Sequence, residues 1–361
     1  MALSLNPTML CTRAALLFGW VLTCFGGPAW SQTPAPAEQK LRVVGGLGGV
    51  NQYTRHEAPF WTTELPRLSG GRFQADIVPF DRAGIRGQEM LSMIKLGTVQ
   101  LGTVLLSLGA ARDVELGAPD LAGLNPDMAT LRRTVFAFRP HLERTLRERH
   151  GVELLALYTY PAQTLFCNAA LTSLESIKGR RVRTANVSQT DFVSALGATA
   201  ISLPFSEVLP SLRSGAIDCA LTGTMTGYTI GLHELSTHLH TLAVSWGLSV
   251  FVANGASWKA MPAELRGLLQ RELPKVEAAV WEEAQRETEE GVACNSGAVA
   301  CKSGKPGRMQ VVRAGNGDEL RRREILTGTV LPNWIKRCGE GCAEMWNRVL
   351  APSTGIQAKP F

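Results

Sequence analysis

Short apolar runs alternate with amphipathic stretches through the first third of the chain. Residues 41–44, 73–78 and 99–106 are strand-like, and the first of these segments leads into a glycine-rich turn at residues 45–49. Between the strands, residues 53–68 and 89–96 carry apolar side chains at helical spacing and end at serine or glycine. This β-α-β-α-β order predicts a lobe with a mostly parallel sheet between helices.

The same alternation starts again near Val152. Residues 154–158, 164–167, 182–184 and 217–221 are predicted strands, and residues 190–196 and 206–213 are predicted helices. Two such halves predict an α/β fold of two lobes with a cleft between them. A long helical stretch follows at residues 262–291, with Pro274 inside it. We assign residues 41–160 and about 250–262 to lobe I, 161–249 to lobe II, 262–293 to a long helix that braces both lobes, and 294–361 to a C-terminal region.

The N-terminus has the pattern of a secretory signal peptide. Arg13 is the only charged residue before Glu38, residues 14–25 are mostly apolar, and Ala29-Trp30-Ser31 ends the segment with a small-x-small sequence. The apolar run is too short to cross a bilayer, so we expect cleavage after residues 1–31 and release into the periplasm. A lipoprotein signal at Cys24 is the alternative, although the residues before it are not small. Residues 32–40 are rich in proline and alanine, and we expect a flexible leader there.

Composition places the chain among ordinary globular proteins, with 45% apolar and 19% charged residues in 361. The formal net charge is +6, but the basic residues are scattered and no aromatic-basic alternation accompanies them. This distribution argues against nucleic acid as a partner and is compatible with an anionic ligand.

Six cysteines remain once the signal peptide is removed, and an oxidising compartment permits disulfides. The spacing predicts two local bridges in the C-terminal region, between Cys294 and Cys301 and between Cys338 and Cys342. Cys167 and Cys219 are either paired or buried and reduced. A zinc site made by the four C-terminal cysteines is less favoured, because their spacings differ from the usual C-x2-C pattern.

No set of catalytic residues stands out. The glycine-rich turn at 45–49 lacks the third glycine and the acidic residue of a dinucleotide-binding motif, and no phosphate-binding loop, H-E-x-x-H or G-x-S-x-G sequence is present. His238 and His240 alternate along one strand face, and with Glu234 and His233 they offer metal-ligand chemistry. We favour a polar surface for these histidines, and predict neither a metal nor a cofactor.

Arginines around one short predicted strand offer binding chemistry instead. Arg181 and Arg183 point to the same face of the strand at residues 182–184. An arginine at the carboxyl end of such a strand faces the crevice where ligands of α/β sheets bind, and its planar fork matches a carboxylate. Arg180 and Arg181 fit exposed positions equally well.

Several motifs in this part of the chain resemble those of the DctP-type solute-binding proteins of TRAP transporters. Residues 173–183 (SLESIKGRRVR) resemble the family's DLKGKKIR segment, and they are followed at matching spacing by LGA at 196–198, SEVL at 206–209 and RSGAID at 213–218. The resemblance covers roughly residues 41–290. It implies a two-lobed, periplasmic binding protein-like receptor, monomeric or dimeric, that closes on a small organic acid and delivers it to membrane permease subunits.

The resemblance also implies which residues contact the ligand. The family's hallmark arginine, which pairs with the ligand carboxylate, falls on Arg183. The other expected cleft positions are Gln163, Asn51, Asn186, Phe205, Thr222 and Trp246. Gln163 stands where many relatives have a second arginine, which favours a monocarboxylate or a neutral-tailed acid over a doubly charged one. A periplasmic binding protein for sensing or for another transporter, and an exported α/β hydrolase, remain as alternatives.

Overall fold

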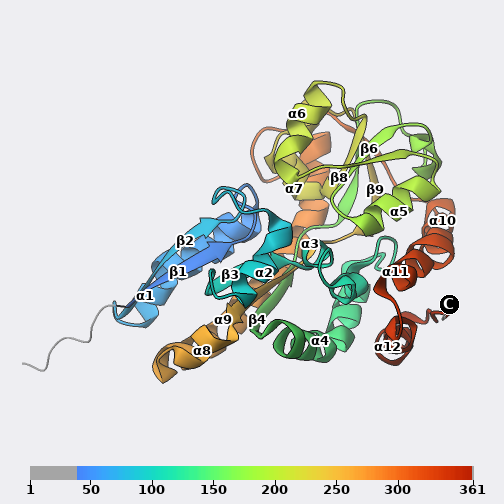
Figure 1. Cartoon of the computed structure of the whole chain (residues 1–361). Coiled ribbons are helices and arrows are strands. Elements are labelled where there is room, and N and C mark those ends of the chain that lie inside the picture. The colour runs from blue at the N-terminus through green and yellow to red at the C-terminus, as the bar shows by residue number, and fades with distance from the viewer. Residues whose placement is uncertain (1–38, 360–361) are drawn as a thin grey trace, which may run out of the picture. The chain divides into compact units, whose positions relative to one another are not determined.

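Two mixed β-sheets with helices packed around them make up residues 39–359, which are the residues that this computed structural model describes (Figure 1). The predicted signal peptide at residues 1–31 lies outside the described residues. Gln39 and Lys40, which the sequence analysis assigned to the leader, already belong to the first strand.

The first sheet has the strand order β2-β1-β3-β10-β4. Its strands are β1 (Gln39–Gly45), β2 (Phe73–Pro79), β3 (Leu101–Leu105), β4 (Val152–Thr159) and β10 (Leu248–Asn254). β1 pairs in parallel with β2 and β3, as the sequence predicts, whereas β10 lies antiparallel between β3 and β4. The sheet is therefore mixed, and the strand that starts near Val152 belongs to this first sheet.

The second sheet has the order β11-β9-β5-β8-β6-β7. Its strands are β5 (Gln163–Cys167), β6 (Arg181–Thr184), β7 (Thr199–Ser202), β8 (Cys219–Gly223), β9 (His238–Ser245) and β11 (Gln310–Val312). β6 pairs in parallel with β7 and β8, while β5 is antiparallel to β8 and β9. The two sheets confirm the predicted α/β fold class.

Helices cover both sheets, and their bounds differ from the predicted ones by a few residues. Residues 51–68 are continuously helical and end in α1 (Leu65–Leu68). The other helices before the C-terminal region are α2 (Met90–Lys95), α3 (Leu106–Gly109), α4 (Met128–His150), α5 (Val187–Ala195), α6 (Val208–Arg213), α7 (Thr224–Thr229), α8 (Gly255–Ala260) and α9 (Ala263–Ser296). None of the helices in residues 39–359 combines the length and apolar composition needed to span a bilayer.

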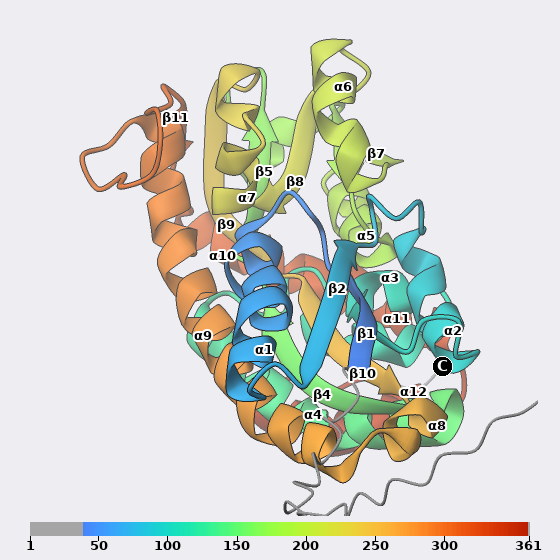
Figure 2. The same ribbon diagram turned by 90° about the vertical axis from the view of Figure 1, so that its left-hand side faces the viewer.

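The long helix α9 runs alongside both sheets, as Figure 2 shows. Near its middle, the indole nitrogen of Trp281 donates to the carbonyl oxygen of Leu157 in β4 at 2.8 Å. One and a half turns further on, the carbonyl oxygen of Glu287 accepts from the hydroxyl of Thr224 at the start of α7, at 3.1 Å. Pro274 lies inside the helix without ending it. The helix thus contacts elements of both halves, and its role as a brace stays a prediction.

Two short chain segments also connect the sheets: residues 160–162 between β4 and β5, and residues 246–247 between β9 and β10. The amide of Tyr160 donates to the carbonyl oxygen of Gly247 at 3.1 Å, so the two connections are hydrogen-bonded to each other. Gly247 has φ of 87°, and a β-carbon there would lie 2.7 Å from the Gln163 side-chain nitrogen. Only glycine fits this crossing without displacing its neighbours.

The C-terminal region contributes β11 to the second sheet and then forms α10 (Asn316–Ile325), α11 (Leu331–Cys338), α12 (Cys342–Val349) and α13 (Ala351–Thr354). Asn333 of α11 donates to Asp191 of α5 at 3.1 Å, and the indole of Trp334 donates to the carbonyl oxygen of Val114 at 3.0 Å. Neighbouring residues of α11 therefore bind elements that belong to different lobes.

Three disulfides occur among the described residues. Two are the local bridges that the spacing predicts, Cys294–Cys301 and Cys338–Cys342. The third joins Cys167 and Cys219, which lie directly opposite each other on β5 and β8. Cys167 and Cys219 are therefore paired, which is one of the two states, paired or reduced, that the sequence left open.

The contact between α9 and α7 leads to a stability prediction. A β-carbon on Gly291 would lie 2.8 Å from the Met225 Cα and closer still to the Met225 amide, so Gly291→Ala must push the two helices apart. We expect a loss of about 1–3 kcal/mol in the free energy of unfolding, measured by urea titration. Gly267→Ala on the same helix meets only the flexible end of Arg271, at 3.4 Å, and is expected to gain about 0.5–1 kcal/mol. Equal effects of the two substitutions would contradict close packing at Gly291.

Candidate functional site

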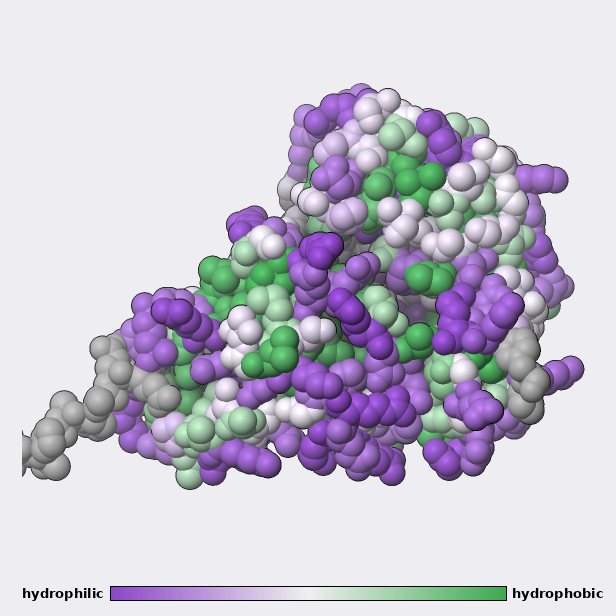
Figure 3. Space-filling view, viewed as in Figure 1, coloured by the Kyte–Doolittle hydropathy of each residue, from purple (hydrophilic) through white to green (hydrophobic). Residues whose placement is uncertain are grey.

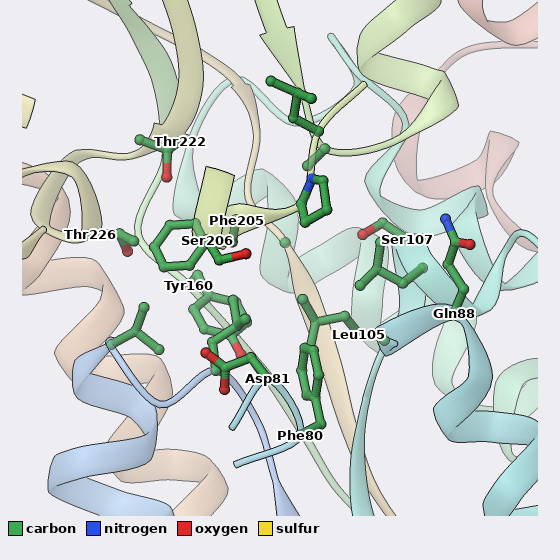
Figure 4. Close-up of a pocket in the computed structure, with 18 of the residues that line it drawn as sticks. Phe80, Asp81, Gln88, Leu105, Ser107, Tyr160, Phe205, Ser206, Thr222 and Thr226 are labelled. Carbon is green, nitrogen blue, oxygen red and sulfur yellow. The ribbon is translucent and has the colours of Figure 1, made fainter. Parts of the chain in front are cut away.

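A cavity of ≈500 Å³ lies between the two sheets. From the first lobe it is lined by residues that follow β1, β2 and β3, and from the second by residues of β5, β6 and β8 and the loop after β7. Figure 4 shows side chains converging on it from both sides, with Thr222 and Thr226 above and Tyr160, Asp81 and Phe80 below. On the face drawn in Figure 3 the surface is hollowed between the upper and lower halves of the described part. This is where a two-lobed α/β protein is expected to bind a ligand.

Arg183 lies in the wall of this cavity, near the carboxyl end of β6. Its side chain is 4% exposed, and its guanidinium donates to the carbonyl oxygens of Leu203 and Leu221, each at 3.0 Å. No carboxylate within residues 39–359 forms an ion pair with it. Burial lowers the pKa of Arg183 to about 10, so the group stays charged at neutral pH. The cavity therefore contains a desolvated, oriented cation that forms no ion pair in the described part of the chain.

Arg181, two residues earlier on the same strand, is in a different environment. Its side chain is 45% exposed and pairs with Asp218 at 2.6 Å. This pair is a solvent-exposed one, at the opposite end of β6 from the cavity, and Arg181 does not line the cavity. The two arginines thus share a strand but not a function.

Gln163 lines the cavity beside the crossing of the two connections. Its carbonyl oxygen accepts from the hydroxyl of Ser245 at 3.1 Å and from the side-chain amide of Gln189. Because the oxygen is used in this way, the side-chain NH₂ group is the part left to face Gly247 and the cavity. Gln163 and Arg183 therefore both present N–H donors, which suits a bound anion.

Phe205 and Thr222 also line the cavity, from the second lobe. Phe205 follows β7, and Thr222 lies next to the end of β8, directly opposite Thr164 of β5. Together with the apolar side chains of Phe80, Leu105 and Val50, Phe205 makes the wall mostly apolar around a few polar groups. Such a lining orients a small ligand through its polar atoms.

Three expected residues do not line this cavity. Val50 lines the cavity, whereas the neighbouring Asn51 does not. The side-chain amide of Asn51 donates to Glu287 of α9. Asn186 is the N-cap of α5, where its side chain accepts from the amide of Gln189 at 3.0 Å. Trp246 is 2% exposed, and its indole nitrogen donates to the carbonyl oxygen of Asn125 at 2.9 Å. The residue at the crossing that reaches the cavity is Gly247.

The histidines that offered metal-ligand chemistry lie elsewhere. His238 and His240 share a face of β9, as expected, but His240 is fully buried, with its Nε2 3.5 Å from Asp318. The expected polar surface is therefore wrong for His240. Its pKa is lowered because burial disfavours the charged ring more than Asp318 favours it.

Several cavity residues were missed by the sequence analysis. Asp81 comes two residues after β2, Ser107 two after β3 and Tyr160 one after β4. The rule that placed Arg183, that ligands bind beyond the carboxyl ends of strands, applies equally to β2 and β3. It would have found Asp81 and Ser107 had it been applied to the first lobe.

A buried carboxylate fixes the glycine-rich turn against the cavity. Glu57 is 3% exposed and accepts from the amide of Gly46 at 2.7 Å, from Thr103 at 3.1 Å and from the hydroxyl of Tyr158. Burial raises the pKa of Glu57 in spite of these donors. The turn is thereby held in a fixed position, with Leu47 and Val50 facing the cavity.

Comparison with known proteins identifies a family that matches most of the chain. The family model of bacterial extracellular solute-binding proteins, family 7 (DctP), matches residues 49–296. An Albidiferax ferrireducens solute-binding protein is 20% identical over 293 residues, 79% of this chain and 82% of that protein. The ectoine-binding periplasmic protein TeaA of Halomonas elongata is 29% identical over 126 residues, which cover 35% of this chain and only 37% of TeaA.

Solved structures agree at the level of fold. DctP7 of Bordetella pertussis, an extracytoplasmic solute receptor binding pyroglutamic acid, has a TM-score of 0.76 at 19% identity and covers 88% of this chain and 100% of its own. A Shewanella oneidensis TRAP periplasmic solute-binding protein with bound succinate has a TM-score of 0.74 at 18% identity, covering 88% of this chain and 99% of its own.

The contact between the start of the helix at residues 51–68 and α9 leads to a prediction about pH. Glu287 is 3% exposed and accepts from Asn51 and, at 3.4 Å, from Gln52; burial raises its pKa to about 7. Since the folded-state pKa exceeds the unfolded value of 4.5, the folded protein binds the extra proton, and this group's contribution to stability falls as pH rises from about 4.5 to about 7.

We therefore expect Glu287→Gln to be about 1–3 kcal/mol more stable than the wild type at pH 8 and nearly equal to it at pH 5, by urea unfolding. A glutamine can also donate to the buried Gln52 Oε1, which has no partner in the described part of the chain. Glu289→Gln, exposed on the same helix, is the control and is expected to show no such pH dependence. A stability difference that does not change between pH 5 and pH 8 would contradict titration of Glu287.

Proposed function

Because the chain belongs to the bacterial extracellular solute-binding proteins of family 7, we propose that it is the periplasmic receptor of a TRAP-type transporter for a small organic acid. In this proposal the signal peptide directs export, the ligand binds in the cavity between the lobes, and the loaded receptor delivers it to membrane permease subunits. Pyroglutamate and succinate, named for solved structures of the same fold, are both small carboxylic acids.

The observation that carries the proposal is the state of Arg183. A buried guanidinium without a counter-ion is costly, and the cost falls when a ligand carboxylate pairs with it. Two of its N–H groups are already directed to backbone carbonyls of Leu203 and Leu221, so the guanidinium plane is fixed before the ligand arrives. Pre-orientation of this kind reduces the entropy lost on binding.

Closure of the lobes supplies the rest of the binding energy in this proposal. The ligand would contact Arg183 and Gln163 from the second lobe, and Phe80 and Tyr160 from the other side of the cavity. Contacts made to both lobes at once stabilise the closed arrangement over the open one, which shifts the population toward it.

Substitution of Arg183 tests the proposal. With a carboxylate that raises the melting temperature of the wild type in a thermal-shift screen, we expect Arg183→Ala to bind about 30-fold to several thousand-fold more weakly by calorimetry, because the carboxylate is then buried without a partner. Arg181→Ala is the matched control and should bind as the wild type does, since Arg181 pairs with Asp218 on the surface. Unchanged affinity in Arg183→Ala, with a folded protein by circular dichroism, would overturn the assigned role.

A further inference from the structure

Two charges in the cavity have opposite signs and come from opposite lobes. Arg183 belongs to β6 of the second sheet, whereas Asp81 follows β2 of the first sheet. Arg86 is the third charged residue of the lining, and it already pairs with Glu89. The cavity therefore presents one cation and one anion that no ion pair within residues 39–359 neutralises.

Asp81 is exposed at the cavity and makes one hydrogen bond to the chain around it. One oxygen of its carboxylate accepts from the amide of Gly48, in the glycine-rich turn, at 3.0 Å. Its second oxygen has no hydrogen-bond partner in the described part of the chain. One carboxylate oxygen thus anchors the loop, and the other is available to a ligand.

Asp81 lies on the same side of the cavity as Tyr160. Figure 4 shows the Asp81 carboxylate near Tyr160, with Thr226 on the other side of the cavity. Burial, Glu57 and Asp81 each raise the pKa of Tyr160, so its hydroxyl stays neutral and keeps its proton. Asp81 and the neutral Tyr160 hydroxyl thus line the same cavity.

We propose that the ligand is a zwitterion, or an acid with a strongly polarised N–H group, whose carboxylate binds Arg183 and whose nitrogen binds Asp81. This inference rests on the proposed receptor function and narrows the class of solute. A hydrogen bond between a cationic N–H and a carboxylate is among the strong ones, and an ammonium or iminium nitrogen supplies such a donor. A dicarboxylate would instead bring its second carboxylate toward Asp81 and be repelled.

Arg183 and Asp81 line the same cavity from different lobes, so one ligand that contacts both would also connect the lobes. The cavity volume of ≈500 Å³ is larger than an amino-acid-sized ligand needs, so in this proposal a movement of the lobes toward each other brings both groups to the ligand. A zwitterion would bridge the opposite charges of the two lobes and thereby favour closure. An acid without the nitrogen would satisfy only the second lobe.

Matched pairs of ligands test the inference. The probes are 3-aminopropionate with butyrate, L-proline with cyclopentanecarboxylate, and 4-aminobutyrate with pentanoate, each pair similar in shape and differing at the nitrogen. We expect the nitrogen-containing member of at least one pair to bind the wild type about 10- to 100-fold more tightly by calorimetry, the range for a hydrogen bond to a charged group. In Asp81→Asn this advantage should disappear, while the amide oxygen still accepts from Gly48.

Three further arms separate the outcomes. Asp76→Asn, an exposed position on β2 that pairs with Lys40, should behave as the wild type does. Arg183→Ala should lose both members of the pair, and Asp81→Lys should gain affinity for succinate. If carboxylates bind through Arg183 but the nitrogen gives no advantage, or Asp81→Asn retains the advantage, the zwitterion inference is overturned and the receptor proposal stands. If no carboxylate binds, with or without nitrogen, both fail.

Discussion

The buried guanidinium of Arg183 is the constraint on which the binding site depends. Removing a charge from water is costly, and here two backbone carbonyls share the compensation without a carboxylate. Those carbonyls belong to Leu203, just after β7, and Leu221 of β8, the strands on either side of β6. Changes in the pairing of these three strands would therefore also change the direction in which the cation points.

Much of the fold could be predicted from periodicity, because short apolar strands and amphipathic helices alternate clearly in both halves. The helix α4 was not predicted, although Leu131, Val135, Phe138 and Leu142 follow helical spacing, because its many charges and Pro140 mask the pattern. The return of the chain through β10 to the first sheet was also outside local reasoning, since strand pairing between residues more than a hundred positions apart leaves no local signal.

A site residue could be predicted where its side chain has one common use in that position, and not where the side chain has several uses. A guanidinium in a short strand of an α/β lobe indicates a ligand, and Arg183 lines the cavity. Asparagine serves equally as a helix cap, which is how Asn186 is used. A tryptophan in a connection between two sheets can line a cavity or lie in the hydrophobic core. The indole of Trp246 lies in the core, where it donates to the carbonyl oxygen of Asn125.

The two connections between the sheets lie directly beside the cavity and are joined by the bond between Tyr160 and Gly247. If one lobe rotates relative to the other about these links, displacement grows with distance from them. Tyr160 and Gln163, beside the links, would then keep almost the same separation. Phe80 follows β2 and Phe205 follows β7, which are edge strands of the two sheets, and these two side chains would move further. A solute would thus first contact Tyr160 and Gln163, which are already in place. Phe80 and Phe205 would enclose it only afterwards.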